Sequence, residues 1–287
     1  TMHVCYCLTP TRYVWRYHQY AEQEDLGRAT RLGLAPFLTF LRQWDRLAAD
    51  RVDHFIAISD EVRRRIAKVY RRDSTIIYPP VNVGRFEPSN RVDDYYLFVG
   101  RLVPYRRLDL LIEAFNTMGR PLKIAGSGRD RERLEALAGP TVEFLGFVPD
   151  ADLPDLLARC RAFVWPGEED FGISPLQANA AGRPVIAYAA GGARETVIPG
   201  LAGATGLAEA TGALFAEQSV AAIIEAVESF DPLAVSPAVV RRHAEQFDLA
   251  VFKRRIDDFV TQKYEEWKSV TTGQSSAGVG RSSSSPR

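Results

Sequence analysis

The sequence has few cysteines, no excess of charge and no long apolar run, and each shortage excludes a class of protein. Its three cysteines in 287 residues, Cys5, Cys7 and Cys160, are too few and too irregularly spaced for a disulfide framework. Basic and acidic residues number 36 each, which argues against nucleic acid as the main partner. No apolar run reaches the roughly 18 residues of a membrane span, and no signal peptide precedes the first strand. We expect a cytoplasmic protein.

The chain starts on the apolar run HVCYCL, which is typical of a strand buried on both faces of a parallel sheet. A central strand is an unusual place for a domain to begin, so the first domain is expected to be incomplete. We place Cys5 and Cys7 on opposite sides of this strand, as reduced core thiols. The four histidines are not spaced as metal ligands usually are, and we assign each a structural role: His3, His18, His54 and His243.

Apolar strands alternate with amphipathic helices from about residue 95 onward, which predicts an α/β protein with a doubly wound parallel sheet. Two prolines, Pro79 and Pro80, indicate a semi-rigid linker before it. We predict a partial first domain over 1–80, a second domain over 81–247, a helix over 248–270 that crosses back to the first, and a disordered serine- and glycine-rich tail over 271–287.

The stretch from Phe163 to Thr196 is the centre of the second domain. It predicts a strand at 163–165, an acidic loop at 166–172, a helix that opens at Ser174 and Pro175 with Ser174 as its cap, a strand at 185–188 and a glycine turn at 191–192. Free N–H groups at a helix start attract phosphate, and two such sets beside one crevice suit a diphosphate.

Cationic side chains follow another predicted strand. Arg101 comes directly after YYLFVG, and Arg106 and Arg107 open the next helix. Because the carboxyl ends of parallel strands line the crevice, Arg101 and Arg106 could clamp the phosphates of a leaving group. Arg107 is better explained as helix-surface charge.

Several other patterns leave alternatives open. Glu168, Glu169 and Asp170 invite a glycosidase interpretation, but three adjacent carboxylates on one loop seldom face each other across a sugar. The turn AGSG resembles the fingerprint of nicotinamide-dependent oxidoreductases, yet it follows the second strand of its domain instead of the first.

Two clusters have both a structural and a functional interpretation. We prefer packing over sugar stacking for the aromatics Trp15, Tyr17 and Tyr20. For the six cations between Arg63 and Arg72 we prefer a solvated helix face over docking on anionic lipid.

Four segments together resemble the donor domain of the retaining GT-B glycosyltransferases of family GT4: GRLVPYRRLDLLIEAF, AGSGRDRERLEALA, FLGFVPDADLPDLLARC and EEDFGISPLQANAAGRPVIAYAAGGARETV. The segment CYCLTPTRYVW is similar to the mannosyltransferase-like branch that builds bacterial surface polysaccharides. The resemblance extends from Met2 to about Glu266. It implies two Rossmann-like domains that face a cleft, the first of them incomplete.

The resemblance also implies a function. The second domain would bind a nucleotide-diphosphate sugar, and a hexosyl group would pass to a saccharide or lipid-linked saccharide with retention and without a metal or other cofactor. GDP-mannose is favoured on the branch resemblance alone. Peripheral contact with the inner face of a membrane through the cations at 63–72 is a further hypothesis.

The expected site residues come from both arguments. Arg101, Arg106 and Glu169 are the expected catalytic residues; Arg101 matches the family's phosphate-binding arginine and Glu169 the first glutamate of its E-x7-E signature. The residues expected to bind the donor are Gly100, Gly126, Gly128, Phe147, Val148, Phe171, Gly172, Ile173, Ser174, Gln177, Gly191, Gly192 and Thr196.

Three positions depart from the family's pattern. Arg106 stands where the family usually has lysine, Gln177 where the second glutamate binds ribose, and Leu8 where many relatives have a histidine. Arg for Lys keeps the charge and adds a planar fork, whereas Leu for His removes a donor outright. A homologue that binds nucleotide or a partner protein without turnover is therefore the alternative prediction.

Overall fold

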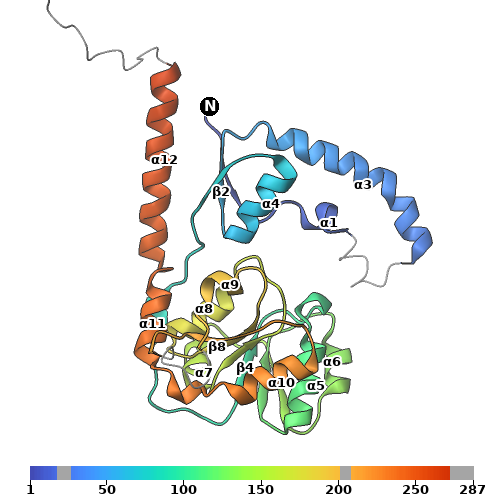
Figure 1. The fold of residues 1–287 in the computed structure, drawn as a ribbon, viewed down its shortest axis with the longest axis vertical. Coiled ribbons are helices and arrows are strands. Elements are labelled where there is room, and N and C mark those ends of the chain that lie inside the picture. The colour runs from blue at the N-terminus through green and yellow to red at the C-terminus, as the bar shows by residue number, and fades with distance from the viewer. Residues whose placement is uncertain (18–26, 201–207, 272–287) are drawn as a thin grey trace, which may run out of the picture.

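The chain forms two separate parallel sheets joined by an extended segment (Figure 1). The computed structural model describes residues 1–17, 27–200 and 208–271. The first sheet has the order β1-β2-β3 and the second the order β6-β5-β4-β7-β8-β9, with every pairing parallel. Both sheets carry helices, as the predicted Rossmann-like α/β class requires.

The second sheet is built from the apolar runs that the sequence predicts as strands. Its strands are β4 (Tyr96–Val99), β5 (Leu122–Ala125), β6 (Val142–Gly146), β7 (Phe163–Trp165), β8 (Val185–Tyr188) and β9 (Gly212–Phe215). Core residues such as Leu97, Ile124 and Ile186 are completely buried, because helices cover both faces. The strand order reverses beside β4, which has β5 on one side and β7 on the other. Ligand crevices in such sheets open at this reversal, beyond the carboxyl ends of the strands.

Helices connect these strands: α5 (Leu108–Met118), α6 (Arg131–Leu137), α7 (Leu153–Arg159), α8 (Ile173–Ala180), α9 (Ala193–Thr196), α10 (Val220–Ser229) and α11 (Pro237–Glu245). Single 3-10 turns lie at η1 (Val83–Arg85), η2 (Pro104–Arg106) and η4 (Pro232–Ala234). The predicted cap of α8 is wrong. Gly172, and not Ser174, takes the capping position, with φ of 93°, and the helix begins at Ile173. Glycine adopts this left-handed conformation without a steric penalty, so the helix can begin before Ser174.

The first sheet contains β1 (Val4–Cys7), β2 (His54–Ala57) and β3 (Ser74–Ile76), with helices α1 (Arg12–Trp15), α3 (Arg28–Ala49) and α4 (Asp60–Tyr70). Ser59 caps α4 by accepting a hydrogen bond from the backbone N–H of Val62. Val62, Ile66 and Tyr70 are the buried stripe of this helix.

The prediction for Cys5 and Cys7 is wrong. Residues two apart on a strand share a face, because side chains alternate with a period of two. A hydrogen bond between the two thiols confirms this, and it lowers the pKa of Cys5 to about 7.

Helix α12 (Leu249–Thr271) runs from the second sheet past the first one (Figure 1). Phe259 on this helix packs in a small apolar cluster with Ile56 of β2 and Ile77, which follows β3. The helix includes Thr271, which the sequence assigns to the tail; the rest of the predicted tail lies outside the described residues. Within the described residues, none of the helices combines the length and the apolar character that crossing a bilayer would require.

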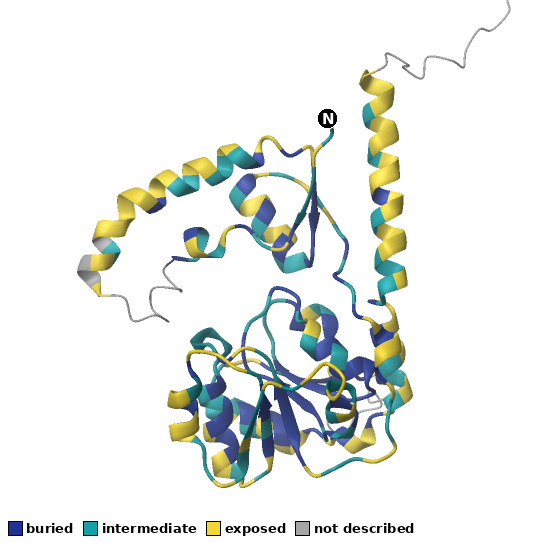
Figure 2. Cartoon of the chain, turned by 180° about the vertical axis from the view of Figure 1, so that it is seen from behind, coloured by how far each residue is buried: buried dark blue, intermediate teal, exposed yellow. Residues whose placement is uncertain are grey.

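Most of the surface of helix α3 is exposed, as is most of the surface of α12 (Figure 2). The apolar residues Leu38, Leu41, Trp44, Leu47 and Ala48 of α3 recur at helical spacing, but only Leu38 of these is buried, and Trp44 and Leu47 are exposed. The apolar residues of this helix occupy more than one face, and the protein body covers only the face around Leu38.

Candidate functional site

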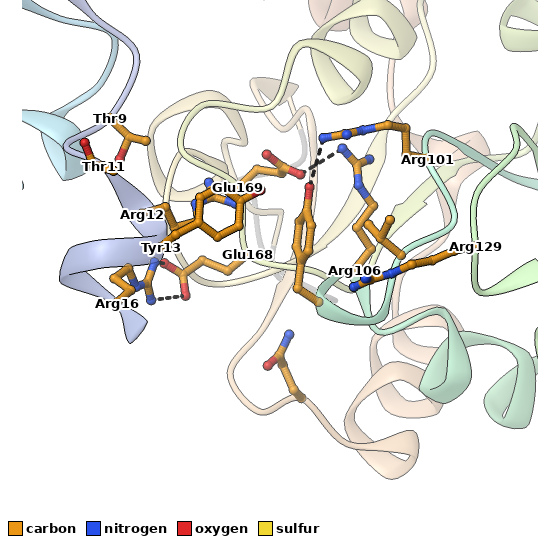
Figure 3. A pocket seen from close by; sticks show the side chains of 13 residues that line it. Thr9, Thr11, Arg12, Tyr13, Arg16, Arg101, Arg106, Arg129, Glu168 and Glu169 are labelled. Atoms are coloured by element: carbon orange, nitrogen blue, oxygen red, sulfur yellow. Dashed lines mark hydrogen bonds and ion pairs between the residues drawn. The ribbon is translucent and has the colours of Figure 1, made fainter. Parts of the chain in front are cut away.

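A cavity of about 600 Å³ lies between the two sheets, at the carboxyl ends of β1, β4 and β7 (Figure 3). Its lining is polar and rich in arginine, and it comes from both halves of the chain. The lining residues are Thr9, Thr11, Arg12, Tyr13, Arg16, Arg101, Val103, Tyr105, Arg106, Arg129, Glu168, Glu169 and Gln218. The structure thus brings Arg101, Arg106 and Glu169, the expected catalytic residues, to one cavity.

The second-sheet wall of the cavity carries Arg101 and Arg106. Arg106 ends η2, where its guanidinium stacks over the Trp165 ring at 4.6 Å from the ring centre. Its Nη2 lies 3.0 Å from Glu169 Oε1. Arg101 Nη2 approaches the Tyr105 hydroxyl at 3.5 Å and forms no ion pair with a carboxylate of the described residues. The planar fork expected of arginine at position 106 is therefore used for stacking, which a lysine ammonium cannot reproduce.

Three buried polar atoms in this wall have no hydrogen-bond partner among the described residues: Arg106 Nε, Trp165 Nε1 and Glu169 Oε1. The approach of Arg106 to Glu169 is thus an ion pair without good hydrogen-bond geometry. Buried polar atoms normally find partners, and an unpaired one costs roughly 1–3 kcal/mol. A ligand with hydroxyl or phosphate oxygens offers acceptors for the two N–H groups and a donor for the carboxylate.

The electrostatics of Glu169 differ from those of its neighbour Glu168. Burial raises the pKa of Glu169, although the charges of Arg106 and Arg12 act against it. Burial also acts to raise the pKa of Glu168, but the hydrogen bonds and charge of Arg16 outweigh it and hold the pKa below its ordinary value. The surroundings therefore stabilise the ionised form of Glu168, whereas they disfavour the ionised form of Glu169.

The first-sheet wall of the cavity carries Arg12 and Arg16, which bind the acidic loop. Arg65 binds the same loop from outside the cavity lining. Arg12 Nη2 donates to Asp170 Oδ2 at 2.6 Å. Arg16 makes a bidentate pair with Glu168, at 2.8 and 3.0 Å. Arg65 on α4 bonds both carboxylates. Planar bidentate pairs of this kind are strong and hold a fixed orientation.

Glycines let the loops of the second sheet approach closely. The N–H of Gly192 donates to the carbonyl of Glu169 at 2.9 Å, and a Cβ on Gly192 would lie 2.2 Å from the carbonyl oxygen of Phe171. A Cβ on Gly126 would lie 1.9 Å from the carbonyl oxygen of Gly100. Any larger residue would separate these loops, so the glycines shape the edge that carries the cavity.

The other residues expected to bind the donor follow the carboxyl ends of β4 to β8, and none of them lines the cavity. Phe147 is 79% exposed, and Ile173 at the start of α8 is also exposed. Thr196 is buried and its hydroxyl donates to the carbonyl of Gly192. The Gly192 N–H, expected as a phosphate donor, is occupied by Glu169. The remaining members of the set are Gly100, Gly126, Gly128, Val148, Phe171, Gly172, Ser174, Gln177 and Gly191.

Sequence reasoning missed most of the lining from the first sheet. Thr9, Thr11, Arg12 and Arg16 follow β1 directly. The argument that selected Arg101, a cation after a parallel strand, applies equally to Arg12. Leu8, which stands where many relatives have a histidine, is 62% exposed and does not line the cavity.

The structure accounts for other sequence predictions in structural terms. Trp15 donates its indole N–H to Asp45 at 2.6 Å and Tyr17 is buried, which supports packing; Tyr20 and His18 lie outside the described residues. His243 is buried with Nε2 2.9 Å from the carbonyl oxygen of Thr196. Among the described residues, no group of three or more His, Cys, Asp and Glu side chains could hold a metal ion.

Most arginines of the basic segment 63–72 have partners inside the protein. Arg63 and Arg64 pair with Asp60 on the same helix, and Arg72 donates to the backbone carbonyls of Ala49, Val52 and Asp53. The Arg63 and Arg64 side chains are still 50% and 58% exposed, and contact with a membrane stays a prediction.

Comparison with solved structures shows the fold. Sucrose-phosphate synthase from Thermosynechococcus elongatus superposes with a TM-score of 0.73, at 23% sequence identity, over 92% of this chain and 68% of that one. The Anabaena protein HepE, solved in complex with UDP-glucose, gives a TM-score of 0.62 at 21% identity over 77% of this chain and 67% of that one. The predicted GT-B architecture is therefore confirmed.

The sequence profile of the family "Glycosyl transferases group 1" matches residues 85–231, just over half of the chain. The chain belongs to this family. The match covers β4 through α10 and so includes the second-sheet wall.

The curated relatives are mannosyltransferases among others. The phosphatidyl-myo-inositol mannosyltransferase of Mycobacterium leprae is 31% identical over 73% of this chain and 63% of its own length. The GDP-mannose-dependent monoacylated alpha-(1-6)-phosphatidylinositol monomannoside mannosyltransferase of Corynebacterium glutamicum is 34% identical over 58% of this chain and 51% of its own. The chain spans about half the length of most of the curated relatives it matches.

Proposed function

We propose that this chain transfers a hexosyl group from a nucleotide-diphosphate sugar to a saccharide or lipid-linked saccharide, with retention at the anomeric carbon. The observation that carries the proposal is the second-sheet wall, where Arg101, Arg106 and Glu169 meet beside buried polar atoms that lack partners. GDP-mannose is the favoured donor, because two relatives named for mannosyl transfer use GDP-mannose by their names.

The two arginines would bind the diphosphate. Arg101 has no carboxylate partner among the described residues, and the Arg106 guanidinium lies over the Trp165 ring, so both can direct N–H groups at phosphate oxygens. Positive charge placed in advance at the leaving group stabilises the transition state without reorganisation. Backbone N–H groups at the start of α8, at Ile173 and Ser174, would add donors to the same end of the donor molecule.

Glu169 would accept hydrogen bonds from hydroxyl groups of the donor sugar. Its Oε1 is buried without a hydrogen-bond donor, and burial raises its pKa, so a sugar hydroxyl would relieve an existing cost. In the proposed retaining reaction, the bond from the anomeric carbon to the phosphate oxygen breaks, and the acceptor oxygen bonds to that carbon on the same face. The acceptor proton passes to the leaving phosphate, so that no protein base is needed.

The experiment measures binding and turnover separately on the full 287-residue chain. GDP and UDP are titrated by calorimetry, and nucleotide release is then measured from GDP-mannose, GDP-glucose, UDP-glucose and UDP-N-acetylglucosamine, with and without a bacterial lipid extract as acceptor. We expect the extract to speed up nucleotide release. We also expect NMR to show that the anomeric configuration of the product linkage is the same as that of the donor sugar. Tight nucleotide binding with no release from any donor would instead support the homologue without turnover.

The arginine-based mechanism also predicts independence from divalent metals. Addition of 5 mM EDTA, a concentration on the order of that needed to remove exchangeable metal, should leave the release rate within about twofold of the untreated rate, because the guanidinium groups supply the neutralising charge. A large loss of rate that Mg²⁺ or Mn²⁺ restores would show that a cation takes part in binding the diphosphate.

A further inference from the structure

Arg65 joins the first sheet to the acidic loop of the second. It lies on α4, its side chain is 12% exposed, and all three guanidinium nitrogens have acceptors. Nε donates to Glu61 at 3.0 Å, within the same helix. Nη1 bonds Thr9 at 3.2 Å and also Asp170, and Nη2 donates to Glu168 at 3.0 Å. One residue of the first sheet thus holds two carboxylates from a loop of the second.

Those two carboxylates flank Glu169. Glu168 points toward Arg16, whereas Glu169 points the opposite way, to Arg106 (Figure 3). Asp170 pairs with Arg12 and Arg65 of the first sheet's half. The segment between β7 and α8 contains no helix or strand. One backbone hydrogen bond, from the Gly192 N–H to the Glu169 carbonyl, helps to fix this segment. Side-chain contacts must otherwise hold its backbone in position.

Helix α4 is itself fixed against the second sheet. The Glu195 carboxylate accepts hydrogen bonds from the N–H groups of Asp60 and Glu61, at 2.8 to 3.4 Å, at the start of this helix. Carboxylates are favourable at a helix N-terminus, because free N–H groups and the helix dipole meet there. Arg65 stands one turn further along, so its attachment point is held independently of the acidic loop.

We infer that Arg65 is a positioning residue, which sets the orientation of Glu169 in the cavity by binding the carboxylate on either side of it. The inference rests on the proposed function, in which Glu169 contacts the donor sugar. Arg65 lies outside the cavity lining, so it acts through Glu169 and not on the donor. It also makes the donor site depend on both halves of the chain, since the first sheet supplies the residue that orients a side chain of the second.

The test compares Arg65→Gln with Arg64→Gln. Arg64 is the adjacent residue on α4, but its side chain is 58% exposed and it pairs with Asp60 and Glu61 of its own helix. We expect Arg65→Gln to lower kcat/KM for the sugar nucleotide by about 10- to 100-fold, because small misplacement of a positioned group costs factors of this size. The affinity for the nucleotide alone should change by less than about twofold. Arg64→Gln should change neither.

A double-mutant cycle with Glu169→Gln separates positioning from a general structural effect. If Arg65 acts through Glu169, Arg65→Gln has little further effect once Glu169 has been replaced. An equal loss in both backgrounds, or a fall in nucleotide affinity that matches the fall in kcat/KM, would overturn the inference. If Arg65→Gln does not fold, Arg65→Met takes its place in the cycle; its side chain is of similar length and carries no charge or N–H donor for either carboxylate, and the same outcomes apply.

A second measurement needs no activity at all. Hydrogen exchange of the peptide that covers residues 166–172 should be faster in Arg65→Gln than in wild type and unchanged in Arg64→Gln. Unchanged exchange in Arg65→Gln contradicts the positioning role, even for an active protein. Inactivity of the wild type with every donor, combined with faster exchange, would refute the proposed function while leaving the attachment of the loop established.

Discussion

The two walls of the cavity contain the same kind of side chain in opposite situations. Arg12 and Arg16 of the first-sheet wall, and Arg65 of α4 outside the lining, are paired with carboxylates of the acidic loop. On the second-sheet wall, Arg101 has no carboxylate partner among the described residues. An arginine that is already neutralised holds the protein together, whereas one without a partner is available to an anionic ligand. The number of arginines around a cavity therefore does not predict anion binding; their pairing does.

Arg106 is intermediate between the arginines that are fully paired with carboxylates and Arg101, which is not. It pairs with Glu169, but its flat face rests on Trp165 and its buried Nε has no acceptor. A partly buried ion pair with imperfect hydrogen bonds contributes little net stability, because desolvation opposes the Coulomb attraction. Such a pair can exchange partners when a phosphate and a sugar enter, which a bidentate pair like Arg16–Glu168 resists.

We expect the largest effect on turnover from a substitution of Arg106. Arg106→Gln should lower kcat about 10²- to 10³-fold, the usual cost of removing one preorganised group that stabilises transition-state charge. The rate of nucleotide release at saturating donor measures it. Arg107→Gln is the matched control, since Arg107 is the next residue but pairs with Asp109 beside it. A kcat within tenfold of wild type for Arg106→Gln would show that the second-sheet wall is not where the charge develops.

A smaller effect should separate the walls by nucleotide affinity. Arg101→Gln should weaken GDP or UDP binding about tenfold, because it removes a charge-assisted hydrogen bond to phosphate worth roughly 1.5 kcal/mol. Arg16→Gln should weaken binding by less than about twofold, since Arg16 is already paired with Glu168. Calorimetric titration of both variants decides the matter. The reverse order of the two effects would remove the distinction between paired and unpaired arginines.

The smallest expected effects are on the free energy of unfolding. Substitutions of the adjacent residues Glu168 and Glu169 should change it in opposite directions. Burial raises the pKa of Glu169, so ionised Glu169 costs stability at pH 7, and Glu169→Gln should raise the free energy of unfolding there by up to about 1 kcal/mol. As pH falls through the raised pKa toward the ordinary glutamate value, wild-type Glu169 becomes protonated and this gain disappears.

Glu168→Gln should do the opposite. The pKa of Glu168 lies below its ordinary value, so its stabilising contribution is present at pH 7 and is lost as pH falls through that lowered pKa. The variant should be less stable than wild type at pH 7 and match it in strong acid. Urea unfolding of both variants between pH 3 and pH 7, roughly the range in which carboxyl groups titrate, tests the pair, and equal signs would contradict the assigned environments.

Local sequence patterns predicted the second sheet almost completely. Apolar runs bounded by turn residues located β4 to β9, and a cation directly after a strand located Arg101. The same patterns failed where two elements compete for one residue. Gly172 displaced Ser174 from the cap of α8, because its left-handed backbone starts the helix earlier. The helix α3 shows a similar limit: its spacing reveals apolar residues but not which face the protein covers.

By itself, the sequence determined the α/β class, the family's motifs and the three residues Arg101, Arg106 and Glu169 that meet at the cavity. Only the tertiary structure decided which arginines are paired. Arg12 and Arg65 meet an acidic loop that lies more than a hundred residues away along the chain. Periodicity and motifs describe a residue's neighbours in sequence, whereas charge pairing depends on distances that arise only when the two sheets face each other.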